Sequence, residues 1–439
     1  MLPHRTLIVC SLVLLASACS RPQWTTRPLR SLPGESARPG VSDASFRALL
    51  ERFTENERRI AWSDAECQHV GRGFAELSAR HERRTGRPLA AASYNAGLAF
   101  RRCGAEAEAK RHFRRAGTLP AARTELVVVE HGAAPNLERS IERLRRIVSD
   151  SRFQEPRALV LLAALELERA RELPDATAAR ELARANLQRA LAIDDGYLPA
   201  LNQLAIYYLD LARAHADQSG RDRAELSRPG AEPPKLSRRH LDLASFAVER
   251  ALARDPSYAP AHNTEGVIHF ELGNYTGAAR AFARARQLDP RFLEAHMNYA
   301  ALNLRFRGFS AAEHAYRAAL ALQPKNYEAH LGLAVALRGQ LAAANQSGLS
   351  LEIERQLALA AKVAPLRPEV DYNRALFALA RQRTLLGADN IRALQEARAA
   401  FDRFVAKAGD EPEYARDVAK AREHLADLRD TLPFLHPEP

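Results

Sequence analysis

Two adjacent stretches of the chain decide its fold: APAHNTEGVIHFELGNYTGAARAFARARQLDPRF, residues 259–292, and LEAHMNYAALNLRFRGFSAAEHAYRAALALQPKN, residues 293–326. Both stretches are 34 residues long, and prolines recur at the same spacing, at Pro256, Pro290 and Pro324. Internal repeats of this length indicate stacked supersecondary units, each of which buries its apolar face only against its neighbours. The repeat therefore predicts an all-α chain built of antiparallel helix pairs.

Small, aromatic and proline residues recur at fixed positions of the two stretches. Small residues at positions 8, 20 and 27 let two antiparallel helices approach closely, and the aromatic residue at position 24 fills the gap that they leave. Proline at position 32 cannot continue the second helix, so it ends the unit. These residues are Gly266, Ala278, Phe282, Ala285 and Pro290 in the first stretch, and Ala300, Ala312, Tyr316, Ala319 and Pro324 in the second.

This pattern resembles the tetratricopeptide repeat (TPR) family, and two adjacent units match it in register. The resemblance implies a right-handed TPR superhelical solenoid of antiparallel helix pairs. Weaker matches carry the period outward through residues 90–123, 198–255 and 327–365. Between Thr124 and Gly196, and after Arg367, helical periodicity continues while the signature residues fade.

The amino-terminal segment predicts export. His4 and Arg5 precede the apolar run 7–15 and the small residues 16–18, which is the order of a secretory signal peptide. The sequence LASAC, ending at Cys19, resembles a bacterial lipobox, although Ala stands at position 16 where Leu is usual. The resemblance implies that Cys19 is acylated and anchors the chain to the outer membrane, facing the periplasm. A soluble periplasmic protein cleaved at the same place is the alternative.

The remaining sequence divides by composition. A Pro- and Arg-rich stretch after Cys19 cannot bury enough apolar surface to order itself, so we expect a flexible tether. A long polar insertion interrupts the repeats, and we expect either a solvated loop or a partner contact there. The predicted organisation is a lipoprotein signal peptide (1–18), a lipid-anchored tether (19–42), amino-terminal TPR-like repeats (43–211), the polar inserted loop (212–239), carboxy-terminal TPR repeats (240–410), and a capping helix with a tail (411–439).

Cysteine usage agrees with export. Cys10 leaves with the signal peptide and Cys19 is the acylation site, so only Cys67 and Cys103 remain. An oxidising compartment makes a disulfide between them plausible. Antiparallel packing of the expected helices 64–84 and 90–102 brings together the two ends that carry these residues. Two buried, unpaired thiols are the alternative.

Charge and motifs argue against several classes of function. The chain has 64 Lys and Arg against 53 Asp and Glu, and a net charge of +11 spread over 439 residues argues against nucleic-acid binding. The nucleotide-binding, hydrolase and metalloprotease motifs are absent from the sequence. His262, His296 and His330 recur at 34-residue spacing, but helices stack about 10 Å apart, too far for three ligands to share one zinc ion. We therefore expect no metal, cofactor, small-molecule substrate or enzymatic activity.

The TPR resemblance implies a binding groove. In that family, positions 5, 9 and 12 of each first helix line the concave face, and here most of them are apolar. Such a groove would suit an amphipathic helix or an extended apolar segment. The alternative is that these residues face a neighbouring helix or a carboxy-terminal cap. The predicted groove residues are Asn263, Val267, Phe270, Met297, Ala301, Leu304, Leu331, Val335 and Arg338.

Together these features predict a non-catalytic, envelope-anchored scaffold that binds protein partners in the periplasm or outer membrane. The signal, the tether, the Cys pair and the Ala/Arg-rich body are similar in arrangement to the TPR lipoprotein of the myxobacterial adventurous gliding machinery. That similarity implies an outer-membrane component of gliding motility. The alternatives are a TPR lipoprotein of type IV pilus or secretin assembly, and an adaptor or enzyme of peptidoglycan remodelling.

Overall fold

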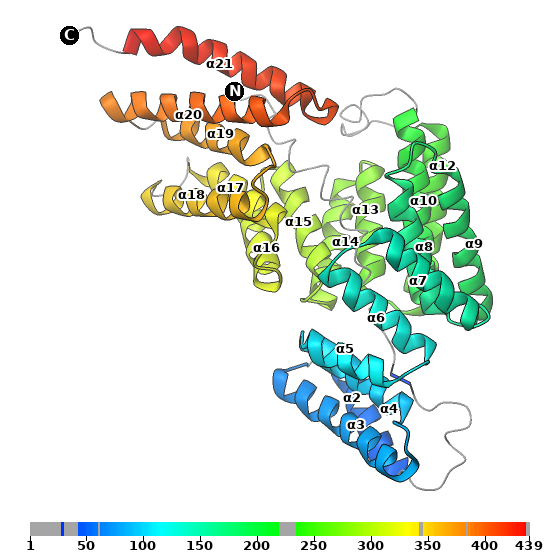
Figure 1. Cartoon of the computed structure of the whole chain (residues 1–439). Helices are drawn as coiled ribbons and strands as arrows, with labels where there is room; N and C mark the ends of the chain where they lie inside the picture. The colour runs from blue at the N-terminus through cyan, green and yellow to red at the C-terminus, as the bar shows by residue number, and fades with distance from the viewer. Residues whose placement is uncertain are drawn as a thin grey trace. The chain divides into compact units, whose positions relative to one another are not determined.

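The computed structural model describes residues 28–29, 43–59, 62–218, 234–341, 346–382, 385 and 387–435. These residues form α-helices joined by turns, with one short 3-10 helix and no β-strand among them (Figure 1). The predicted all-α fold is therefore confirmed. The signal peptide, Cys19 and most of the predicted tether lie outside the described residues.

The chain divides into two compact units, which meet in sequence between Gly273 and Asn274. In the first unit each helix packs against the one before it, and the alternate helices α6, α8, α10 and α13 also contact one another in order. This is the packing of stacked helix pairs. Its helices are α2 (Asp43–Arg59), α3 (Asp64–Thr85), α4 (Ala90–Arg102), α5 (Glu106–Arg115), α6 (Pro120–Ala133), α7 (Leu137–Asp150), α8 (Pro156–Ala170), α9 (Thr177–Ile193), α10 (Leu198–Gln218), α12 (Lys235–Arg254) and α13 (Ala259–Glu271).

The second unit continues the same pattern. Consecutive helices pack in order from α14 to α21, and the alternate helices α15, α17 and α19 contact one another. Its elements are α14 (Tyr275–Leu288), α15 (Leu293–Arg305), α16 (Phe309–Leu322), α17 (Tyr327–Gln340), α18 (Gln346–Val363), α19 (Glu369–Gln382), α20 (Gly387–Ala408), the 3-10 helix η2 (Pro412–Tyr414) and α21 (Ala415–Leu435).

The signature residues explain how closely the helices approach. A Cβ atom added at Gly97 of α4 would collide with the ring of Phe113 on α5, the aromatic at position 24 of the same repeat. In the second unit the ring of Tyr316, also at position 24, lies where a Cβ of Gly332 on α17 would stand. Both rings are fully buried. The aromatic residue therefore needs a small residue on the opposing helix.

The turn between the two helices of a repeat has its own requirement. Position 15 adopts the left-handed conformation in three repeats, with φ of 73° at Gly104, 73° at Gly273 and 62° at Arg307. Such a residue ends a helix because its amide bonds back to the last helical turn. Glycine adopts this conformation without strain, and arginine does not. Arg307 is therefore a strained departure from the pattern.

Two predicted boundaries differ from the structure. Helix α10 runs to Gln218 and α12 begins at Lys235, so both ends of the predicted 212–239 loop are helical. The imidazole rings of His215 and His240 stack between these two helices, with their centroids 5.1 Å apart. Residues 219–233 lie outside the described residues. The predicted capping helix begins with η2 and continues as α21 to Leu435.

Candidate functional site

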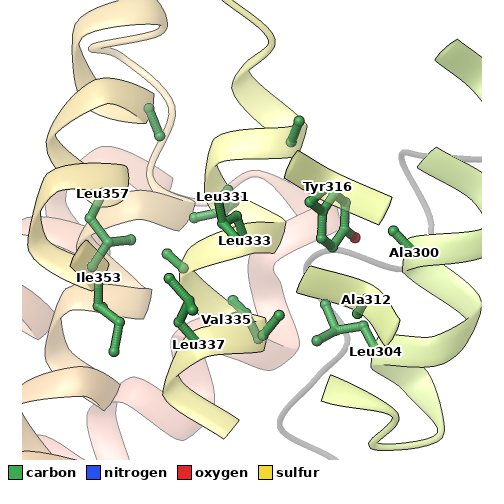
Figure 2. Packing of buried hydrophobic residues seen from close by; sticks show 14 of the residues in the cluster. Ala300, Leu304, Ala312, Tyr316, Leu331, Leu333, Val335, Leu337, Ile353 and Leu357 are labelled. Atoms are coloured by element: carbon green, nitrogen blue, oxygen red, sulfur yellow. The ribbon is translucent and has the colours of Figure 1, made fainter. Parts of the chain in front are cut away.

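Most of the predicted groove residues lie in a packed core. Met297 and Leu304 of α15 and Leu331 and Val335 of α17 are all buried, within one cluster that α15–α19 share (Figure 2). Ala301 is partly buried and packs against the same cluster. The prediction of an exposed apolar groove at α15 and α17 is therefore wrong.

The physical reason is that α17 is surrounded. Every residue from Ala329 to Leu337 is buried, so α17 presents no face to solvent along that length. A helix that is apolar all round is buried in this way. The adjacent helix α19 contributes Val370 and Phe377 to the cluster and covers positions that would line a groove in a more open stack.

The other predicted groove residues vary in exposure. Asn263 and Val267 of α13 are buried, and Phe270 is partly buried. Arg338 of α17 is partly buried, and its Nη1 donates a hydrogen bond to Oδ1 of Asn373 at 3.4 Å. None of these four side chains is an exposed apolar contact residue.

The histidine column has a structural role. Nε2 of His262 lies 3.0 Å from the carbonyl oxygen of Pro256, Nε2 of His296 lies 2.9 Å from that of Pro290, and Nε2 of His330 lies 2.9 Å from that of Pro324. Each histidine thus bonds to the proline that ends the preceding repeat. Among the described residues, no group of three or more His, Cys, Asp or Glu side chains forms a potential metal site.

The partners of these rings define their protonation. A carbonyl oxygen only accepts, so each Nε2 must carry a proton and donate it. In His296 the other nitrogen, Nδ1, accepts a hydrogen bond from Nε of Arg286 at 3.0 Å, which requires the neutral ring. Burial lowers the pKa of His296, and nearby Arg286 lowers it further. The neutral ring of His296 is therefore the form that joins its own repeat to the one that ends at Pro290.

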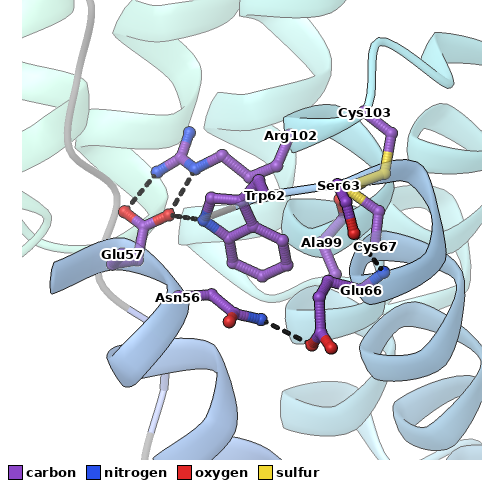
Figure 3. The surroundings of a disulfide bond; sticks show 9 residues. All are labelled: Asn56, Glu57, Trp62, Ser63, Glu66, Cys67, Ala99, Arg102 and Cys103. Carbon is purple, nitrogen blue, oxygen red and sulfur yellow. Dashed lines mark hydrogen bonds and ion pairs between the residues drawn. A yellow bond between two sulfur atoms is a disulfide. The ribbon is translucent and has the colours of Figure 1, made fainter. Parts of the chain in front are cut away.

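A disulfide joins Cys67 near the start of α3 to Cys103 at the end of α4, with their Cα atoms 5.9 Å apart (Figure 3). A polar network next to it attaches α2. Glu57 accepts hydrogen bonds from Arg102 at 2.6 and 2.9 Å and from Nε1 of Trp62 at 2.7 Å. The disulfide pairing was expected from the sequence. The network was not, because Glu57 and Arg102 lie on helices whose relative register the sequence leaves open, and Trp62 lies between α2 and α3.

A buried ionic cluster joins three first helices of the first unit. Glu125 of α6 is fully buried and pairs with Arg157 of α8 and with Arg101 of α4. Burial raises the pKa of the nearby Glu155 to about 7, against the opposing effect of Arg157. It also raises the pKa of Tyr94. The paired charges of Glu125, Arg101 and Arg157 therefore link α4, α6 and α8.

The exposed face of α12 is the surface that sequence reasoning missed. Leu236, Leu243 and Phe246 have 47%, 37% and 60% of their surface exposed. Spacings of seven and three residues place them on one side of the helix. Arg239 and Arg250 are exposed on the same side. These apolar side chains and arginines therefore share one exposed side of α12.

Comparison with known proteins gives the fold. No family model and no curated protein matches this sequence. A monomeric mutant of IFIT1 solved with m7Gppp-AAAA matches with a TM-score of 0.53 at 13% identity, over 90% of this chain and 82% of that one. A thermophilic TPR protein of Thermus thermophilus matches with a TM-score of 0.40 at 22% identity, over 50% of this chain and 99% of that one. PilF of Pseudomonas aeruginosa matches with a TM-score of 0.42 at 17% identity, over 60% and 97%.

The chain thus has the all-α fold of a TPR solenoid. Within the part of the chain that the structure describes, no helix is both long and apolar enough to cross a bilayer.

Proposed function

We propose that the chain is a non-catalytic, lipid-anchored scaffold of the bacterial cell envelope, acting with protein partners in gliding motility. The observation that carries the envelope part of this proposal is the disulfide between Cys67 and Cys103. Structural disulfides persist in oxidising compartments and are rare in the cytosol. The signal-like segment before Cys19 supports the same compartment.

The non-catalytic part of the proposal has a positive argument. Three buried carboxylates are held by arginines or a lysine from neighbouring segments: Glu166 by Arg145 at 2.7 Å, Glu369 by Arg367 at 2.6 Å, and Asp371 by Lys407 at 2.7 Å. Charges paired in this way fix helices to one another. Each of the three is buried and held by a cation of the same chain, so these carboxylates fit a structural role.

The proposed partner surface is the exposed face of α12. Its apolar residues Leu236, Leu243 and Phe246 are flanked by Arg239 and Arg250, so the occupant that it fits is a protein segment with an apolar face and acidic edges. An amphipathic, acidic helix of an envelope protein has that chemistry. Burial of Phe246 would supply most of the binding energy, and Arg239 and Arg250 would orient the partner segment through its acidic residues.

The test is photo-crosslinking in intact cells. A photoreactive amino acid is placed at Phe246, and in a matched control at Leu351 of α18, which is 70% exposed in the second unit. We expect an exported protein to be captured at Phe246 only, and its capture to fall at least tenfold when Arg239 and Arg250 are both replaced by Glu. Equal capture at both positions, or capture of cytosolic proteins alone, would overturn the proposed surface.

The anchor is tested separately. Metabolic labelling with palmitate should mark the wild-type chain and a Cys10→Ser variant, but not a Cys19→Ser variant. Labelling that survives in Cys19→Ser would refute the anchor. The identity of the crosslinked protein then distinguishes the machines: envelope proteins of gliding support the proposal, whereas a secretin would indicate pilus assembly.

A further inference from the structure

A short piece of the predicted tether is bound to the first repeat. The backbone N–H of Leu29 donates to Oδ1 of Asn95 at 2.9 Å, and Nδ2 of Asn95 donates to the carbonyl oxygen of Leu29 at 2.9 Å. One side-chain amide therefore satisfies both backbone groups of a single residue. This is the pairing that a neighbouring β-strand would offer.

The contact is buried and apolar around its polar centre. Asn95 lies on α4 with none of its surface exposed, although it is a polar residue. The side chain of Leu29 packs against the core cluster of α2–α6, which includes Phe74, Phe100 and Phe113. A buried amide without partners would be costly, and Leu29 supplies a partner for each end of it.

We propose that Pro28–Leu29 is a built-in occupant of the α4 surface, a latch that fixes the amino-terminal segment to the first repeat. The recognition is of backbone plus one apolar side chain. The position of Asn95 supports a dedicated site. Asn298 occupies the same repeat position on α15 of the second unit and is also buried, so it is the matched position for a control.

The latch changes how far the body can lie from a membrane, a consequence that rests on the proposed acylation of Cys19. From Cys19 to α2 there are 24 residues, and from Cys19 to Leu29 there are ten. A fully extended chain spans at most about 3.5 Å per residue, so the reach falls from about 80 Å to about 35 Å. The latched segment would hold the first repeat, and with it the disulfide, close to the lipid surface.

The test measures hydrogen exchange at the Leu29 amide in the full chain extracted in detergent. We expect exchange at least about tenfold slower than that of an unstructured peptide in the wild type. An Asn95→Leu variant, which keeps the volume and removes both hydrogen bonds, should lose that protection. The matched control Asn298→Leu should retain it. Unprotected exchange in the wild type, or equal protection in Asn95→Leu, would overturn the latch.

A second variant tests the latch without changing the buried Asn95, whose substitution could disturb the fold of the first repeat. Leu29→Pro removes the backbone donor at a position outside every helix, so the helical signal should be unchanged. Arg30–Ser31 is the sole Lys or Arg bond between residues 20 and 42 that is not followed by proline, so trypsin reports on it alone in this stretch. We expect cleavage there to be at least tenfold faster in Leu29→Pro. Equal cleavage would refute the latch. Both readouts are independent of acylation, so a failed palmitate experiment would leave them intact.

Discussion

Two helix contacts, one in each unit, solve the same packing problem with different chemistry. In the second unit, α15–α18 meet through apolar side chains such as Tyr316 and Leu331 around small residues (Figure 2). In the first unit, α4, α6 and α8 meet at Glu125, which pairs with Arg101 and Arg157. The sequence signature fades in the region of α6–α9, where buried charges take part in joining the helices.

The difference teaches what each kind of contact tolerates. An apolar contact loses stability in proportion to the volume removed. A buried ion pair need not stabilise more than an apolar pair, but removing one partner leaves a charge without compensation. The contact of α4, α6 and α8 should therefore be more sensitive to single substitutions of charged residues than the α15–α18 cluster.

Of the substitutions that test this comparison, removal of Glu125 should cause the largest loss of stability. Glu125→Ala leaves Arg157, which is 4% exposed, without its carboxylate, and we expect a loss of about 3–5 kcal/mol in the first unit. Hydrogen exchange of the α4, α6 and α8 amides measures it. The matched control is Glu142→Ala, which breaks the exposed pair with Arg146 on α7 and should cost under about 1 kcal/mol. Similar losses in the two variants would contradict the distinction.

Opening the disulfide should destabilise the same unit by a comparable amount. The bridge spans 36 residues, and the chain-entropy model gives about 4 kcal/mol for a loop of that length. We expect the Cys67→Ser, Cys103→Ser double variant to show faster exchange in α2–α4 and no change in α15–α18. Reduction of the wild-type chain should reproduce the pattern. Unchanged exchange in α3 and α4 would refute it.

Acid should weaken the first unit through His112. This buried ring stacks on Phe100, and burial lowers its pKa to about 4 from the ordinary value of 6.5. Between those values the unfolded chain binds the proton and the folded chain does not, so stability falls as the pH drops from about 6.5 to about 4, by at most about 3 kcal/mol. His112→Phe keeps the stack and should flatten this dependence in denaturant titrations. A slope equal to that of the wild type would exclude His112 as its source.

The smallest expected effect is at the left-handed turn of the second unit. Arg307→Gly should stabilise this unit by about 0.5–1 kcal/mol, because glycine adopts positive φ without strain. Gly104→Ala, at the same repeat position in the first unit, should destabilise by a similar amount. Thermal melting of both variants checks the opposite signs. Shifts in the same direction would show that the turn conformation is not the cause.

The repeat signature was sufficient to predict the helices and their pairing. The aromatic residue at position 24 and the small residues facing it make contacts within one repeat or with the next. Such contacts are close in sequence, so residue spacing predicts them. The groove prediction failed at Leu331 and Val335 because their exposure depends on α19, a helix that begins more than thirty residues later. Spacing gives the side of a helix on which a residue lies, but it does not give what covers that side.

The buried charges were also beyond the sequence. Glu125 and Arg157 lie on helices of a chain with many exposed Arg and Glu residues, and composition alone would place them in solvent. Their pairing depends on the register between α6 and α8. Leu29 was missed for a related reason, since a Pro- and Arg-rich stretch with two leucines has no periodicity to mark a contact.

Each histidine bonds to the proline six residues before it, so a whole repeat can be removed without changing this contact. Deleting Leu293–Asn326 would join Phe292 directly to Tyr327, and His330 would then stand six residues after Pro290, as His296 does now. His330 would then be placed to bond to the carbonyl oxygen of Pro290 without any other change. The same geometry permits duplication of a unit, so a chain of this kind can lengthen or shorten by whole repeats during evolution while every boundary keeps its hydrogen bond.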